Sequence, residues 1–94
     1  MEIRFYMDPD TGLPHVAGHG VTEQEAEEVL RSKGEDTKAA EGSRRKIGRT
    51  IEGRLLQVIY VPDNIGDGIF VITAYELRNK AQKAFRRRKK RKRP

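Results

Sequence analysis

Histidine, tyrosine, arginine and lysine side chains in this chain are suited to chemistry on a phosphodiester. Cleavage of RNA by the neighbouring 2′-hydroxyl needs a base for the hydroxyl proton, an acid for the leaving oxygen and cations for the charge that grows on phosphorus. His19 can serve as acid or base because imidazole titrates near neutral pH, and Tyr75 can donate a proton or stack on a base. Arg45, Lys46 and Arg49 are candidates to bind the phosphate.

The spacing of these three cations limits which of them can act together. Successive residues of a strand face opposite sides, so Arg45 and Arg49 share one face and Lys46 takes the other, unless Gly48 marks a bulge. Ile47 lies on the Arg45 face, and if that face is core the arginines lie at its rim. A solvated charged strand without a ligand is the alternative interpretation.

Other kinds of site find little support. His15 and His19 are four residues apart, but Pro14 and Gly18 argue against a helix there and no third metal ligand is evident. The chain has no cysteine, which excludes disulfides and thiolate metal sites. Glycine-rich phosphate loops, dinucleotide fingerprints and nucleophile elbows are absent from the sequence. We therefore expect no metal and no cofactor.

Charge divides the chain into two unlike parts. The net charge of +6 combines a body, residues 1–77, with nine basic and fourteen acidic residues, and a segment, residues 78–94, with eleven basic and no acidic ones. Such a segment favours binding to a polyanion, with an affinity that falls as salt rises. Its nucleic-acid-binding candidates after the last apolar residue are Arg86, Arg87, Arg88, Lys89, Lys90, Arg91, Lys92 and Arg93.

The elements that must position these side chains begin with a helix after residue 22. Thr22 and Glu25 form a capping box, in which each side chain accepts a hydrogen bond from the other's backbone N–H. An apolar stripe follows at helical spacing: Ala26, Val29 and Leu30. A second helix is predicted after residue 76 from the spacing of Leu77, Ala81, Ala84 and Phe85.

Strands are predicted between the helices and at the N-terminal end. They span residues 2–7, 44–51, 55–61 and 69–75. Glu52 and Gly53 form a predicted two-residue turn, and the polar residues 35–43 fit either a strand or a loop. We expect an α+β fold in which a small antiparallel sheet of three to four strands lies between an N-terminal and a C-terminal helix.

Ninety-four residues allow one domain, which we place at residues 1–85. No apolar residue follows Phe85, so residues 86–94 are predicted to be a disordered basic tail that orders on a polyanion. No run of 18 apolar residues occurs, and we expect a cytoplasmic protein without membrane contact.

Four short segments, in this order, resemble the BrnT-like toxins and the related DUF4258 family. They are residues 19–22 (HGVT), 47–50 (IGRT), 53–56 (GRLL) and 72–74 (ITA). The resemblance covers residues 8–88 and implies a RelE-like ribonuclease fold, RNA cleavage without metal and neutralisation by an antitoxin protein. It implies functional roles for His19, Arg49 and Arg54. The chain departs from the family at Gly18, where a lysine is common, and at residues 73–75 (TAY), where the family often has Ser-Ala-Arg.

Three functions follow as hypotheses. The first is a toxin-like RNA-binding protein acting as a metal-independent endoribonuclease, with His19 and Tyr75 transferring protons and Arg45, Arg49 and Arg54 binding phosphate. The second is a non-catalytic module that binds RNA, DNA or ribosomes through the basic tail, with RNA favoured over DNA as the nucleic acid. The third is an interaction protein whose basic end meets an acidic partner.

Overall fold

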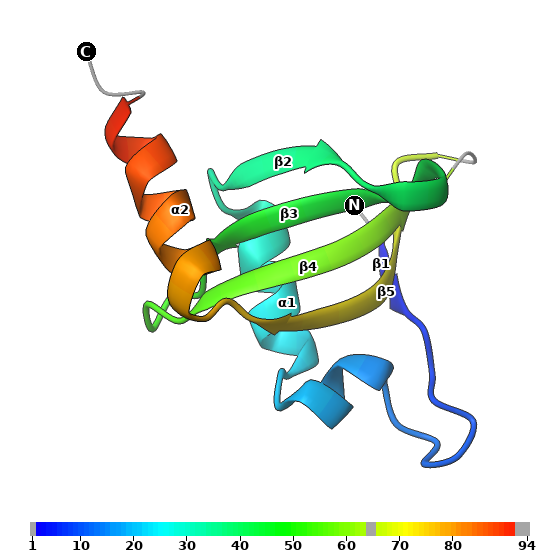
Figure 1. The fold of residues 1–94 in the computed structure, drawn as a ribbon. Helices are drawn as coiled ribbons and strands as arrows, with labels where there is room; N and C mark the ends of the chain where they lie inside the picture. The colour runs from blue at the N-terminus through cyan, green and yellow to red at the C-terminus, as the bar shows by residue number, and fades with distance from the viewer. Residues whose placement is uncertain (1, 64–65, 92–94) are drawn as a thin grey trace.

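A five-stranded mixed sheet organises the chain. A computed structural model describes residues 2–63 and 66–91. The strands are β1 (Ile3–Phe5), β2 (Glu35–Lys38), β3 (Arg44–Arg49), β4 (Leu55–Pro62) and β5 (Ile69–Glu76), in the spatial order β1-β5-β4-β3-β2 (Figure 1). β1 runs parallel to β5 and the other neighbours are antiparallel. The α+β class with two helices is confirmed, but the sheet is larger than predicted and is not purely antiparallel.

The two helices lie on opposite faces of the sheet. In Figure 1, α1 (Glu23–Arg31) lies behind the strands, and α2 (Asn79–Arg91) lies in front of one end of the sheet. We call these the α1 face and the α2 face. A short 3-10 helix, η1 (His15–His19), precedes α1, and another, η2 (Ala40–Gly42), joins β2 to β3. None of the described helices is long and apolar enough to cross a membrane.

The predicted capping box starts α1. Thr22 Oγ1 accepts from the Glu25 N–H at 3.0 Å, and Glu25 Oε1 accepts from the Thr22 N–H at 3.0 Å. The apolar stripe of this helix is buried against the α1 face together with side chains from β4 and β5. This cluster forms the main core, and its buried members include Val29, Leu56 and Val71.

Gly48 allows a close approach and is not a bulge. A Cβ on Gly48 would collide with the Ser32 hydroxyl, and a Cβ on Gly34 would collide with the Ile47 carbonyl. The β3–β4 register is regular from Arg44 to Arg49, and the irregularity in the sheet lies instead between Ile59 and Tyr60, against β5. Alternation along β3 is therefore uninterrupted.

Local boundaries differ from the sequence-based expectation at three places. Residues 35–43 contain both a strand and a turn of 3-10 helix. β3 ends two residues earlier than predicted because the turn begins at Thr50, whose N–H donates to the Arg54 carbonyl at 2.8 Å. β1 is short and, at the sheet edge, pairs with β5 from Ile3 to Phe5, a contact between distant parts of the chain.

The helix α2 extends beyond the predicted end of the domain. We expected disorder from residue 86, whereas the structure continues the helix to Arg91; residues 92–94, including the candidates Lys92 and Arg93, lie outside the described residues. Phe85 is 1% exposed and packs with Ile47, Leu55 and Leu77 on the α2 face. One turn later Arg88 Nε donates to Glu35 Oε2 at 2.8 Å. These contacts hold the helix against the sheet without a further apolar residue.

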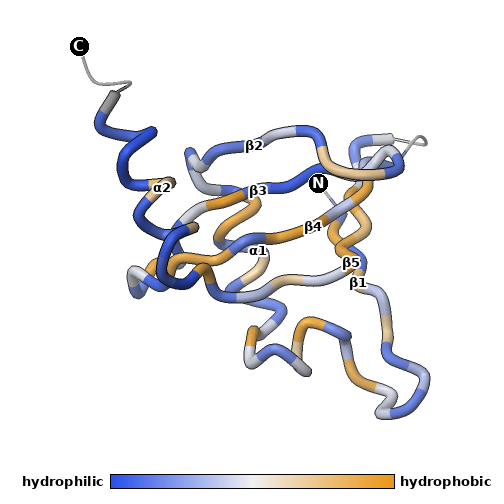
Figure 2. The backbone as a smooth tube through the Cα atoms, in the orientation of Figure 1, coloured by the Kyte–Doolittle hydropathy of each residue, from blue (hydrophilic) through white to orange (hydrophobic). Residues whose placement is uncertain are grey.

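Hydropathy follows the two faces. Figure 2 shows hydrophobic segments along β4 and β5 and an almost wholly hydrophilic α2. On the α2 face only the small cluster around Phe85 is covered by the helix, and beyond it Ile59 and Phe70 are half-buried. Among the described residues, the part of this face beyond α2 is therefore partly exposed.

Candidate nucleic-acid interface

His19 and Tyr75 lie ring to ring although they are far apart in the sequence. Their ring centroids are 6.1 Å apart with an interplanar angle of 59°. His19 ends η1, which is anchored by the buried Val16 and terminated by Gly20 at φ 71°, a conformation that glycine adopts without strain. Tyr75 is next to last in β5 and is 37% exposed. The structure thus brings together the two candidates for proton transfer.

Gln57 holds the Tyr75 hydroxyl. Its Nε2 donates to Tyr75 Oη at 2.6 Å, and the two residues are paired across β4 and β5. Because the amide supplies the hydrogen, the phenolic O–H remains able to donate to a bound group. Gln57 is 9% exposed, and sequence reasoning missed it. A polar residue inside the apolar run 55–61 was the available signal, since a buried polar side chain needs a partner.

Arg54 ties together the segments that carry the two rings. Its Nη1 donates to the carbonyl of Gly20, the residue after His19, at 2.8 Å, and its Nε donates to the carboxylate of Glu76, the residue after Tyr75, at 3.0 Å. Nη1 also contacts both carboxylate oxygens of Glu25. The structure therefore commits this predicted phosphate binder to internal contacts.

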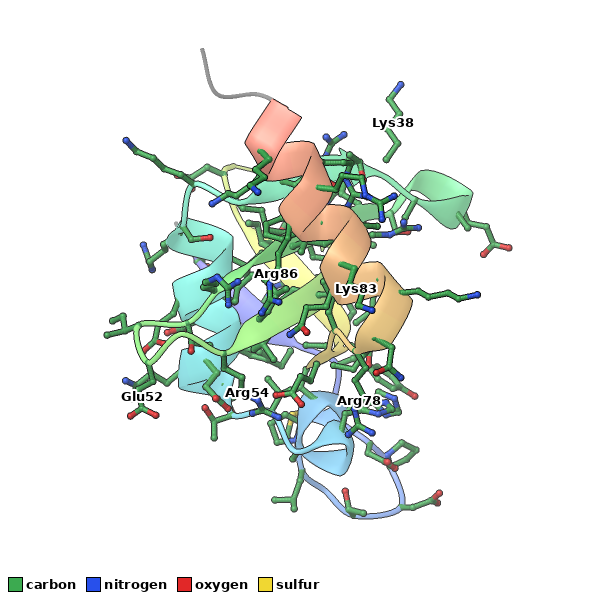
Figure 3. All side chains as sticks on the ribbon, turned by 60° about the vertical axis from the view of Figure 1, so that its left-hand side comes forward. Lys38, Glu52, Arg54, Arg78, Lys83 and Arg86 are labelled. Atoms are coloured by element: carbon green, nitrogen blue, oxygen red, sulfur yellow. The ribbon has the colours of Figure 1, made fainter. Side chains whose placement is uncertain are left out.

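These contacts perturb both charges. The hydrogen bonds that Arg54 donates to Glu76 and Glu25 raise the pKa of Arg54 above its ordinary value. The hydrogen bond from the backbone N–H of Thr22 lowers the pKa of Glu25, and the hydrogen bond from Arg54 lowers it further, whereas burial acts in the opposite direction. Figure 3 shows Arg54 at the end of the sheet near α1. Arg54 is best described as a residue that positions His19 and Tyr75.

Arg49 belongs to a cationic groove beside α2. The groove has a volume of about 470 Å³ and is lined by Arg49, Phe85, Arg86, Arg87, Lys89 and Lys90. Lys89 Nζ lies 5.7 Å from the centroid of the Phe85 ring, and Arg49 Nη1 donates to the Gly53 carbonyl at 3.0 Å. No acidic side chain is among these lining residues. The groove presents five cations, an arrangement suited to a phosphate backbone.

Arg88 is turned to a different neighbour. Its guanidinium bonds to Glu35 on β2, and this hydrogen bond raises the pKa of Arg88. Figure 3 shows Lys83 and Arg86 projecting from different sides of α2, so the helix presents positive charge around much of its surface.

Arg45 and Lys46 lie on opposite faces, as the spacing predicted. Arg45 is on the α2 face, where it pairs with Ile59, which in turn pairs with Thr73. In the described part of the chain, Arg45 Nε and the Thr73 hydroxyl are buried without a hydrogen-bond partner. Lys46 faces α1, and its Nζ donates to the Leu30 carbonyl at 3.4 Å. Lys46 therefore does not join the other candidates.

The two imidazoles lie close to each other, and one of them lies close to an acidic side chain. The ring centroids of His15 and His19 are 5.4 Å apart, and His15 Nδ1 lies 3.8 Å from Asp8 Oδ2. Within residues 2–63 and 66–91, no three His, Cys, Asp or Glu side chains are grouped so that they could hold a metal ion.

Comparison of the chain with protein-family models, with curated proteins and with solved structures finds no match. The resemblance to BrnT-like toxins thus remains a prediction from the sequence.

Proposed function

We propose that the protein is a toxin-like RNA-binding protein of RelE/BrnT type that cleaves RNA without a metal ion at the His19–Tyr75 pair. The observation that carries the proposal is the meeting of these two exposed rings, with Gln57 bonded to the phenol. Tyr75 shares the α2 face with Gln57 and Ile47, and Ile47 packs against Phe85 of the basic helix. A proton-transfer pair and a cationic helix therefore border the same face.

In the proposed reaction His19 removes the proton of a 2′-hydroxyl. The freed oxygen attacks the adjacent phosphorus and forms a 2′,3′-cyclic phosphate, while the bond from phosphorus to the 5′-oxygen breaks. The Tyr75 hydroxyl supplies the proton to that leaving oxygen, and the imidazolium restores it. The opposite assignment of acid and base is chemically equivalent in its products.

Cleavage is expected to be slow. Arg54 is engaged by two carboxylates, Lys46 faces away, and Arg49 lies in the α2 groove. A single preorganised donor to the developing charge is worth about 3 kcal/mol in a closed site. With these cations committed elsewhere, the stabilisation of the phosphorane falls to Tyr75 and to Arg45, which lies on the same face of the sheet.

The test is incubation of the purified protein with RNA in EDTA, analysed for cyclic phosphate ends. His19→Ala and Tyr75→Phe, purified in the same way, are expected to lower the cleavage rate at least about 100-fold. Tyr75→Phe keeps the ring and should leave RNA binding intact. Cleavage that persists in both variants would show a contaminating nuclease. Intact RNA, together with normal growth of cells that express the protein without an antitoxin, would refute the catalytic proposal.

A non-catalytic RNA-binding module is the second candidate. The engagement of Arg54 by Glu25 and Glu76 favours it, because a guanidinium close to the ring pair is used for structure. Under this alternative His19→Ala changes neither RNA integrity nor cell growth, whereas loss of the α2 cations weakens binding. The two candidates thus differ in the effect of one histidine.

A further inference from the structure

The His19–Tyr75 pair is one end of a row of four rings. His15 follows His19 at 5.4 Å between ring centroids, and Tyr6 follows His15 at 5.9 Å. The row therefore runs from the end of β5 along η1 to the residue after β1. Only its His19–Tyr75 end is used in the proposed cleavage.

Backbone hydrogen bonds fix the outer half of the row to the sheet. The Tyr6 N–H donates to the Val71 carbonyl of β5 at 2.8 Å, and the His15 N–H donates to the Tyr6 carbonyl at 2.9 Å. A bridge between Met7 and Pro14 closes the intervening loop. The rings are thus presented by a structure that is already formed, which lowers the entropic cost of binding.

These rings are exposed, unlike aromatic residues that serve the core. Tyr6 is 43% exposed and the His15 side chain 39%, whereas Tyr60 in the core is 6% exposed. Neighbouring rings are tilted by 58° to 74°, so they do not cover one another's faces as parallel stacked rings would. Free aromatic faces at a surface are what an unpaired nucleobase stacks on.

Charge favours bases over phosphates at the outer end of the row. Asp8 lies 3.8 Å from His15, and its carboxylate would repel a phosphate there. The cations instead gather in the groove beside α2. A strand that placed its backbone near α2 and its neutral bases on the rings would match both surfaces.

We propose that Tyr6 and His15, with His19 and Tyr75, form a stacking site for unpaired nucleobases, so that the ligand is single-stranded RNA. This inference rests on the proposed function, since it names the kind of RNA which that site takes. Duplex RNA keeps its bases stacked inside the helix and cannot offer them to the row.

The experiment compares three labelled 2′-O-methyl oligonucleotides of equal length by fluorescence anisotropy: a single strand, a strand with abasic sites and a duplex. The 2′-O-methyl group removes the attacking hydroxyl, so cleavage does not interfere. We expect the single strand to bind about tenfold more tightly than the abasic strand, as one stacked base would contribute. Tyr6→Ala and His15→Ala should each remove most of that difference and leave abasic binding unchanged.

Tyr6→Phe is the matched control, because it keeps the ring and should keep the preference. Equal affinity for the single and abasic strands, or a preference that survives both alanine variants, would overturn the stacking site while leaving RNA binding in place. If none of the three oligonucleotides binds in dilute buffer, the proposed function fails and the stacking site fails with it. Circular dichroism of Tyr6→Ala and His15→Ala checks that each variant is folded.

Discussion

The two faces of the sheet differ in how their side chains are packed and paired. On the α1 face, α1 and the strands bury a continuous apolar cluster, and charged groups at its border are paired. On the α2 face, the helix covers a small cluster around Phe85; within the part of the chain that the structure describes, Tyr75 is exposed, and Arg45 Nε and the Thr73 hydroxyl have no hydrogen-bond partner. Stability is concentrated on one side of the sheet and candidate binding groups on the other.

Strand β3 shows this division within six residues. Lys46 and Gly48 face α1. Lys46 donates to a carbonyl of that helix, and Gly48 leaves room for the Ser32 side chain. Arg45 and Arg49 face α2. In the described part of the chain, Arg45 Nε is buried without a hydrogen-bond partner, and Arg49 lines the cationic groove. Whether a basic residue of β3 packs against α1 or is a candidate to bind a ligand therefore depends on which face of the sheet its side chain takes.

The largest expected effect is a difference in the stability lost when a packed side chain is removed from each face of the sheet. Leu56 and Ile59 lie on β4 and face opposite sides; Leu56 is fully buried and Ile59 is half-buried. Leu56→Ala should lower the free energy of unfolding by about 3 kcal/mol through lost burial and a residual cavity. Ile59→Ala should cost about 1 kcal/mol. Urea unfolding measures both, and equal losses would contradict the division.

Arginine substitutions sharpen the same comparison. Arg54→Met should lower the free energy of unfolding by about 2 kcal/mol, because the carboxylates of Glu25 and Glu76 lose a charged donor. Arg45→Met should change it by less than about 0.5 kcal/mol. Arg54 does not contact the substrate in the proposed reaction. If it positions the His19 and Tyr75 rings, Arg54→Met should nevertheless slow RNA cleavage. A larger loss of stability from Arg45→Met would contradict the assignment.

The smallest expected effect is a pH dependence on the α1 side. The pKa of Glu25 is lowered in the folded chain, chiefly by the Thr22 N–H, so its contribution is present at neutral pH and lost as the pH falls through the folded value. Glu25→Gln should therefore flatten the acid limb of the stability curve by an amount on the order of 1 kcal/mol. Thermal melts between pH 3 and 7 at constant ionic strength, roughly the range over which a glutamate titrates, provide the measurement. An acid limb that is unchanged in this variant would contradict the role given to the carboxylate.

Local signals in the sequence predicted much of the fold. The capping box at Thr22, the apolar runs of β4 and β5 and the alternation along β3 each depend on neighbouring residues, and the structure confirms them. Contacts between distant segments were not predictable in this way. The parallel pairing of β1 with β5, the Gln57–Tyr75 bond and the three partners of Arg54 join residues 18 or more apart.

The extent of helix α2 was not predictable for a similar reason. Helix α2 continues past Phe85, and Arg88 in this stretch bonds to Glu35, 53 residues earlier in the chain. The composition of residues 86–94, with eight basic residues, gave no sign of this tie. His19 and Tyr75 were each recognised as candidates from their chemistry, but their proximity depended on how η1 packs on β5.

The salt dependence of RNA binding tests most directly whether the α2 face binds RNA. The double variant Arg86→Gln with Lys90→Gln removes two cations of the groove, and Arg31→Gln with Lys38→Gln removes two exposed cations elsewhere. The first pair should weaken binding to single-stranded RNA and reduce the slope of log affinity against log salt by about 1.4, the value for two phosphate contacts. The second pair should leave the slope near that of the unmodified chain. Equal slopes for both double variants, or no binding at low salt, would contradict the assignment of the α2 face to RNA.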